Sequence, residues 1–141
     1  MAMNAPVTRE VASNPWAKIV YFDEWKTLEL QWLPLSKDMS DDQVKDTLQL
    51  FADACKELRP PYLLVDVLQF HRGFTDDINA WRDANIIPVY NSSGVRKMAF
   101  LAPEQFPQTF EKGYQPANEP LATFPTGWFS ERHNLDRWLG R

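Results

Sequence analysis

Hydrophobic and polar residues near the start of the chain follow the pattern of a β-hairpin. Residues 18–22 are mainly β-branched and aromatic, which is typical of a strand, and residues 23–26 have the composition of a turn. In residues 27–32 every second position is apolar from Leu28 onwards, which predicts a strand with one apolar and one polar face. Pro34 ends this strand because it has no N–H to donate. We expect the two strands to pair antiparallel.

An amphipathic helix is predicted over residues 41–59. Ser40 and Gln43 have the spacing of a capping box, and Pro60 and Pro61 end the segment. Apolar residues recur at spacings of three and four: Val44, Leu48, Phe51, Cys55 and Leu58. Cys55 is the single cysteine, so an internal disulfide is excluded and a buried thiol in the core is expected.

Two further apolar runs predict buried strands. Residues 62–68 are almost continuously apolar, as in a strand covered on both faces, and residues 95–102 form a similar run. Between them, Thr75 is a good N-cap for a shorter helix, which Pro88 should end or kink.

The last part of the chain is rich in proline. Residues 103–120 are compatible with either a short helix or a long loop. Residues 121–124 are expected to form a short edge strand. Ser130 is expected to cap a final helix, and its buried patch contains Leu135, Trp138 and Leu139.

Alternating strands and helices predict an α/β (α+β) fold. We expect a mixed β-sheet with an N-terminal antiparallel hairpin and helices packed on it. The chain has 141 residues, the size of one domain. We expect a flexible N-terminal arm over residues 1–15 and a single domain over residues 16–141.

Composition excludes several functional classes. The net charge of −4 argues against a general nucleic-acid binder, which needs a basic face. The apolar stretches are too short to span a membrane, and no signal peptide is evident, so we expect a cytoplasmic protein. There is no glycine-rich phosphate loop, serine elbow or paired-histidine spacing. We therefore expect no cofactor, no metal and no catalytic residue, and lean towards a protein that is not an enzyme.

The pattern of hydrophobic positions over about residues 16–139 resembles a known family. Its parts are the antiparallel hairpin, the run Tyr62-Leu-Leu-Val-Asp66-Val67, the capped helix carrying Trp81, the strand Lys97-Met-Ala-Phe-Leu101, and the ending Phe129-Ser130 followed by Leu135 and Trp138-Leu139. These parts are similar to the SpoIIAA-like proteins of the STAS superfamily. That superfamily includes anti-sigma-factor antagonists and the cytoplasmic tails of sulfate transporters, and it is related in shape to Sec14-type lipid carriers. The resemblance implies a STAS-like fold and brings no catalytic residue with it.

The chain departs from this family where a regulatory serine would stand. STAS regulators typically carry an aspartate-serine signature before the second helix, and Thr75 is the only hydroxyl residue at that helix start. Thr75 is thus a candidate phosphorylation site, but the neighbouring Asp76 and Asp77 would repel a phosphate, which favours a simple N-cap. The Ser92-Ser93-Gly94 triplet follows the helix, at the opposite end from the signature.

Three residues near the end of the 62–68 strand are candidates for ligand binding. Asp66 interrupts an apolar run, so it is either satisfied by hydrogen bonds or faces a cleft at the strand end. His71 and Arg72 follow the strand, where open α/β sheets commonly bind ligands, and could hold an anionic group. The alternative is that both are solvated loop residues.

Aromatic residues make up 13% of the chain, and five of them are difficult to place in the core. They are Trp25, Phe106, Phe110, Tyr114 and Trp128. Three interpretations remain open for them: core or loop packing, contact with a partner or a second copy, and the lining of a small-molecule pocket.

The sequence favours a non-enzymatic protein-interaction or regulatory module, which binds a protein partner or a second copy of itself as a homodimer. The alternative is a protein, or an enzyme, that binds a small apolar or anionic ligand between the 69–75 loop and the 103–120 segment. An aromatic-lined pocket with convergent polar groups would favour the alternative.

Overall fold

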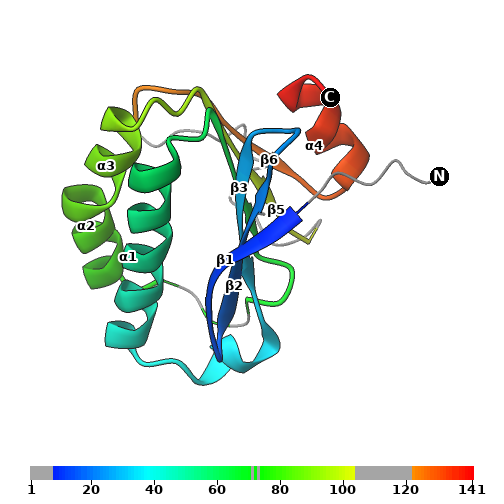
Figure 1. The fold of residues 1–141 in the computed structure, drawn as a ribbon. Helices are drawn as coiled ribbons and strands as arrows, with labels where there is room; N and C mark the ends of the chain where they lie inside the picture. The colour runs from blue at the N-terminus through cyan, green and yellow to red at the C-terminus, as the bar shows by residue number, and fades with distance from the viewer. Residues whose placement is uncertain (1–7, 71, 73, 104–121) are drawn as a thin grey trace.

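The chain forms one mixed sheet flanked by helices on both faces (Figure 1). The computed structural model describes residues 8–70, 72, 74–103 and 122–141. Six strands lie in the order β1-β2-β3-β4-β5-β6: β1 (Thr8–Asn14), β2 (Ala17–Phe22), β3 (Thr27–Trp32), β4 (Tyr62–Asp66), β5 (Lys97–Leu101) and β6 (Thr126–Phe129). The pairs β1–β2 and β2–β3 are antiparallel, and every pair from β3 to β6 is parallel.

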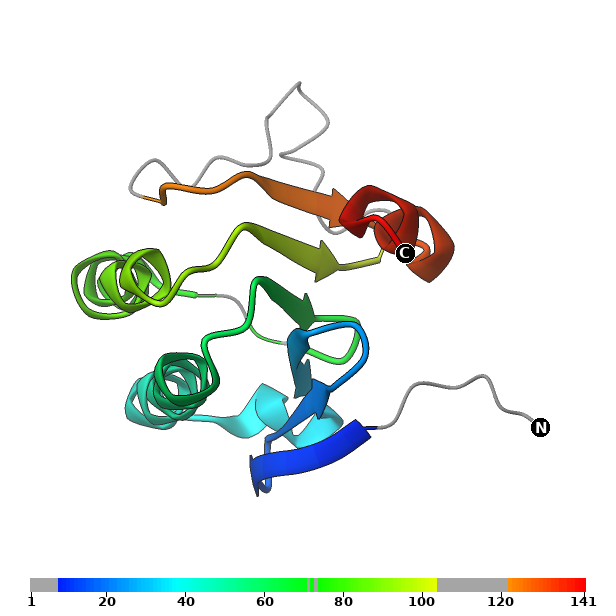
Figure 2. The same ribbon diagram turned by 45° about the horizontal axis from the view of Figure 1, so that its top comes forward.

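The helices divide unequally between the two faces of the sheet (Figure 2). They are α1 (Asp41–Leu58), α2 (Asp76–Asn85), α3 (Ile87–Ser92) and α4 (Arg132–Leu139), with a short 3₁₀ helix η1 (Pro34–Asp38) before α1. Helices α1, α2 and α3 cover one face, and α4 packs alone on the other. The predicted α/β fold with an antiparallel hairpin and packed helices is confirmed.

Local sequence signals explain the best-predicted elements. Ser40 and Gln43 form the expected capping box: the Ser40 hydroxyl accepts from the Gln43 N–H at 3.1 Å, and the Gln43 side chain accepts from the Ser40 N–H at 2.9 Å. The helix ends at Arg59, which adopts the left-handed conformation (φ 49°) just before the proline pair. The 18–32 hairpin pairs antiparallel as predicted, with Ile19 opposite Leu30.

Two apolar clusters lie on the two faces of the sheet. The larger one fills the space between the sheet and α1, α2 and α3, and it contains Cys55, which is fully buried. Burial raises the pKa of the Cys55 thiol to about 11, so it stays protonated as expected of a core residue. The smaller cluster lies under α4 and contains five buried residues: Leu64, Ala99, Leu101, Leu135 and Leu139. Strand β4 is therefore covered on both faces, as its continuous apolar run predicts.

The two ends of the sheet differ from the sequence prediction. Residues 8–14 form edge strand β1 and not a flexible arm, because their backbone pairs with β2; residues 1–7 lie outside the described part. The last strand of the described residues is β6 at residues 126–129; of the expected edge strand 121–124, residues 122–124 are not in a strand, and residue 121 lies outside the described part. Glycine is uncommon in strands, so Gly127 weakens the sequence signal for β6. A larger residue does not fit there, because a Cβ at position 127 would lie 2.8 Å from the Phe129 ring.

The helix boundaries near the prolines also differ in part. The helix that Thr75 caps ends before Pro88 as predicted: α2 ends at Asn85, and Pro88 lies in the first turn of the short helix α3. The predicted Ser130 cap is wrong: Glu131 is the N-cap of α4, and it makes no side-chain capping hydrogen bond. Apart from Pro103, the 103–120 segment lies outside the described residues. Among the described helices, none has the length and apolar composition needed to cross a membrane.

Candidate functional site at the carboxyl edge of the sheet

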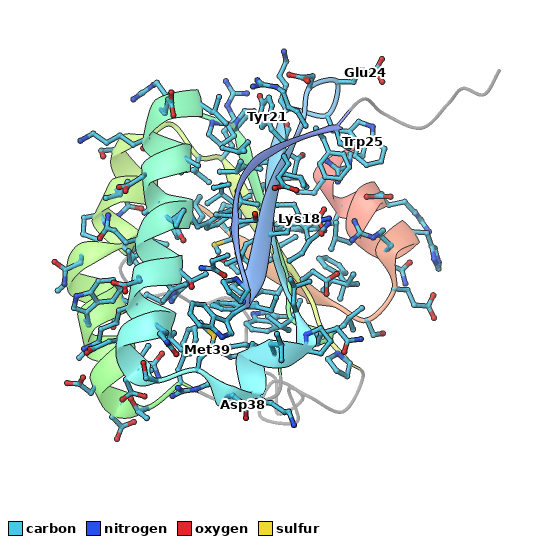
Figure 3. The ribbon with its side chains drawn as sticks, turned by 60° about the horizontal axis from the view of Figure 1, so that its bottom comes forward. Lys18, Tyr21, Glu24, Trp25, Asp38 and Met39 are labelled. Carbon is cyan, nitrogen blue, oxygen red and sulfur yellow. The ribbon has the colours of Figure 1, made fainter. Side chains whose placement is uncertain are left out.

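The four parallel strands end at one edge of the sheet, which we call the carboxyl edge. Gln31, Asp66, Leu101 and Phe129 lie side by side in register near this edge and face α4. Helix η1 and residues 67–70 continue from the strand ends, and Figure 3 shows Asp38 at this end of the sheet, opposite Trp25 in the hairpin turn. Strand ends of open α/β sheets are the usual location of binding sites.

A fully buried carboxylate anchors the first residue of α4. The Glu29 side chain is 0% exposed and accepts hydrogen bonds from Arg132 Nη2 at 3.0 Å and Nη1 at 3.4 Å. Gln31 Nε2 also donates to Glu29 Oε2, at 3.0 Å. A buried carboxylate is tolerated only when it is paired and hydrogen-bonded, and these three bonds meet that condition. The Arg132 guanidinium is thereby held in one place.

Asp66 lies on the other side of the same guanidinium. Its Oδ1 accepts from the Leu68 N–H at 3.0 Å, and its Oδ2 lies 3.8 Å from Arg132 Nη2. The side chains of Asp66 and Arg132 are 21% and 41% exposed, so both reach solvent. Burial raises the pKa of Asp66; the Leu68 N–H opposes this shift, Glu29 adds to it, and Arg132 lowers it. An acceptor and a donor thus stand beside each other at the surface.

The C-terminal end of α4 is held at the opposite edge of the sheet. Arg141 Nε donates to Asp136 Oδ1 at 3.2 Å, Arg141 Nη1 contacts the Thr27 hydroxyl, and the guanidinium lies 4.0 Å from the centre of the Trp25 ring. Lys97 Nζ also donates to the Trp138 carbonyl at 2.7 Å. Helix α4 is therefore attached by polar contacts at both ends and by a small apolar cluster between them.

Two exposed leucines lie in the segments at the carboxyl edge. Leu35 and Leu68 are 55% and 38% exposed, and among the described residues they are the large hydrophobic side chains that stand out to solvent. The Ser36 hydroxyl donates to the Gln69 carbonyl at 3.1 Å, which ties η1 to the turn after β4. This contact brings the neighbours Leu35 and Leu68 to the same edge.

The predicted ligand-binding residues do not converge on one site. Arg72 lies on the α1 side, where Nη1 donates to the Met39 carbonyl and Nη2 to Asp41 Oδ1, both at 2.7 Å. An anionic ligand at Arg72 would have to compete with the Asp41 carboxylate. Asp66 belongs to the cluster on the α4 side, and His71 lies outside the described residues.

Thr75 has the geometry of an N-cap. Its hydroxyl accepts from the Ile78 N–H at 3.1 Å at the start of α2. This bond satisfies one of the free N–H groups of the first turn, so capping accounts for the residue. Its candidacy as a phosphorylation site remains a prediction.

The interface candidates that the structure describes have intramolecular contacts. Trp25 stacks on Phe22 with ring centres 5.3 Å apart, and Trp128 stacks on Phe100 at 4.1 Å. Both are half-buried. For these two, packing within the chain accounts for part of each surface; Phe106, Phe110 and Tyr114 lie outside the described residues.

Glu29, Gln31 and Arg132 are the site residues that the sequence did not identify. Alternation in β3 placed Glu29 and Gln31 on a polar face, but it could not show that a helix covers this face. A signal was present in α4, where Arg132 occupies the first turn. A cation there opposes the helix dipole, which indicates that a specific partner holds it.

The cluster has the chemistry of hydrogen-bond recognition. Within the described ranges, no group of three or more histidine, cysteine, aspartate or glutamate side chains could hold a metal ion. Asp66 accepts and Arg132 donates; Glu29 binds the Arg132 guanidinium on its other side, and Gln31 donates to Glu29. No protein-family model, curated protein or solved structure matches the chain.

Proposed function

We propose that the protein is a non-enzymatic interaction or regulatory module of SpoIIAA-like fold, which acts in the cytoplasm as a homodimer. The sequential parallel strands β3 to β6 after an antiparallel hairpin agree with the fold that the hydrophobic pattern implies. Several polar candidates, Arg72 and Thr75 among them, hold the chain's own backbone. A role in binding is therefore better supported than a role in chemistry.

One observation carries the proposal: two exposed leucines lie at the carboxyl edge, in segments that the Ser36–Gln69 hydrogen bond joins. Burying apolar surface contributes about 25 cal/mol per Å², so exposed Leu35 and Leu68 gain free energy from any partner that covers them. Asp66, which accepts from the Leu68 N–H, and Arg132 next to it supply polar groups, as in the rim around the apolar centre of an interface. A two-fold axis at this edge would place the same patch on both subunits.

Light scattering coupled to size-exclusion chromatography tests the proposal. We expect the wild-type chain to elute with twice the mass of 16.4 kDa and the double variant Leu35→Asp/Leu68→Asp to elute as a monomer. The matched control, Asn79→Asp, adds a carboxylate at an exposed position of α2 and should leave the dimer intact. A monomeric wild type, or a dimer that survives the double substitution, would show that the proposal is wrong.

A further inference from the structure

The separation between Asp66 and Arg132 suggests how the carboxyl edge recognises its partner. Nη2 and Oδ2 are 3.8 Å apart, which is longer than a direct N–H···O hydrogen bond of about 2.7–3.2 Å. Arg132 is fully engaged with Glu29 on one side, and Asp66 accepts the Leu68 N–H through its other oxygen. The two facing atoms therefore form a donor and an acceptor beside each other, without closing on one another.

The surrounding residues hold this pair in a fixed arrangement. Asp66 is the last residue of central strand β4, and the Leu68 N–H fixes its carboxylate. Arg132 is the first residue of α4, and the buried Glu29 fixes its guanidinium, with Gln31 holding Glu29 in turn. Rigid elements and supporting hydrogen bonds of this kind are what a preorganised binding site requires.

A donor and an acceptor side by side match the backbone of one extended residue. In an antiparallel ladder, the N–H and the C=O of one residue can both form hydrogen bonds with the same opposite residue, so these two groups point the same way. Arg132 can donate to such a C=O while Asp66 accepts from the N–H of the same residue. Leu68 is two residues from Asp66 and 38% exposed, so an apolar side chain of the bound residue would pack against it.

We propose that Asp66 and Arg132 bind the backbone N–H and C=O of one extended, apolar residue of a second copy of this chain. The inference rests on the proposed interaction function and gives it a recognition element. Main-chain hydrogen bonds supply affinity in this mode, and the neighbouring leucines supply selectivity for apolar side chains.

Titration with a minimal peptide probe tests the inference. N-acetyl-leucine N-methylamide carries the N–H and C=O of one residue, and it is added in excess to the ¹⁵N-labelled full chain because it competes for the edge that a second copy would cover. We expect concentration-dependent NMR shifts at the Leu68 amide and at Arg132 Nε–H. The control probe has an N-methylated leucine and so lacks the N–H that Asp66 would accept; we expect it to bind at least about tenfold more weakly.

A pair of protein variants provides the second comparison. Asp66→Asn keeps an acceptor for the Leu68 N–H but loses the charged acceptor, and it should weaken the probe about tenfold. Asp38→Asn removes a carboxylate from exposed η1 at the same edge and should not change binding. The absence of shifts, equal binding of both probes, or unchanged binding by Asp66→Asn would each overturn the inference. If the leucine substitutions still abolish the dimer in that case, the proposed function stands and only this recognition element fails.

Discussion

Removing Arg132 should destabilise the fold more than removing the charge of its partner. Arg132→Met deletes the guanidinium and leaves Glu29, which is 0% exposed, with only the Gln31 hydrogen bond among those described. Breaking a buried ion pair from one side costs about 3–5 kcal/mol, because the remaining charge is neither hydrated nor paired. We expect a loss in this range for the free energy of unfolding.

The reverse substitution should cost less because the two partners differ in exposure. Glu29→Gln leaves Arg132, whose side chain is 41% exposed and can be hydrated, and the amide still offers an oxygen to the guanidinium. We expect a loss of about 1–2 kcal/mol, the scale of one charged hydrogen bond made neutral. The double variant Glu29→Gln/Arg132→Met buries no charge, so it should be more stable than Arg132→Met alone.

Urea denaturation at pH 7 followed by circular dichroism measures these differences. The comparison is valid where the slope of the free energy with urea is the same in all four proteins. The double-mutant cycle then gives the coupling between the two residues. Equal losses of unfolding free energy in the two single variants would refute the claim that the buried Glu29 charge depends on Arg132. A double variant whose loss equals the sum of the two single losses would refute it too.

Three further substitutions have defined expected outcomes in the same assay. Thr75→Ala should cost about 1 kcal/mol because α2 loses its N-cap hydrogen bond, and an unchanged midpoint would contradict this. Gly127→Ala should cost about 1–3 kcal/mol because the new Cβ would lie 2.8 Å from the Phe129 ring. Asp66→Asn should stabilise the fold at pH 7, because a raised pKa means that folding disfavours the ionised carboxylate. This gain should shrink as the pH falls through the raised pKa, and it should vanish only well below the ordinary value of 3.8, where the wild-type carboxyl is neutral in both states; a gain independent of pH would contradict the assignment.

Elements determined by local sequence could be predicted from the chain alone. The bounds of α1 could be predicted to within one residue. The signals were the capping box at Ser40, the proline pair after the helix, and the apolar spacing between them. The hairpin was equally clear, since alternation and the turn composition agree. Both depend on neighbours in sequence, so no knowledge of the rest of the fold was needed.

Elements that depend on distant partners could not be predicted in the same way. Strand β1 is polar and exposed at an edge, and only its backbone pairing with β2 defines it. Strand β6 contains Gly127, whose place is set by the rings of Phe129 and Trp138. The key ion pair joins Glu29 to a residue 103 positions later, and alternation in β3 cannot distinguish a solvent-facing carboxylate from one that a helix covers.

The two members of the proposed recognition pair should respond differently to substitution, and this difference separates a binding role from a structural one. Arg132 serves both purposes, because its bonds to Glu29 attach α4 to the sheet while its outer side faces Asp66. Any change at Glu29 should therefore weaken stability and peptide binding together. Burial raises the pKa of Asp66 and so disfavours its ionised form, and Asp66→Asn should therefore raise stability and lower binding. Residues retained at a cost in stability are characteristic of functional sites, and opposite signs in the two assays would place Asp66 among them.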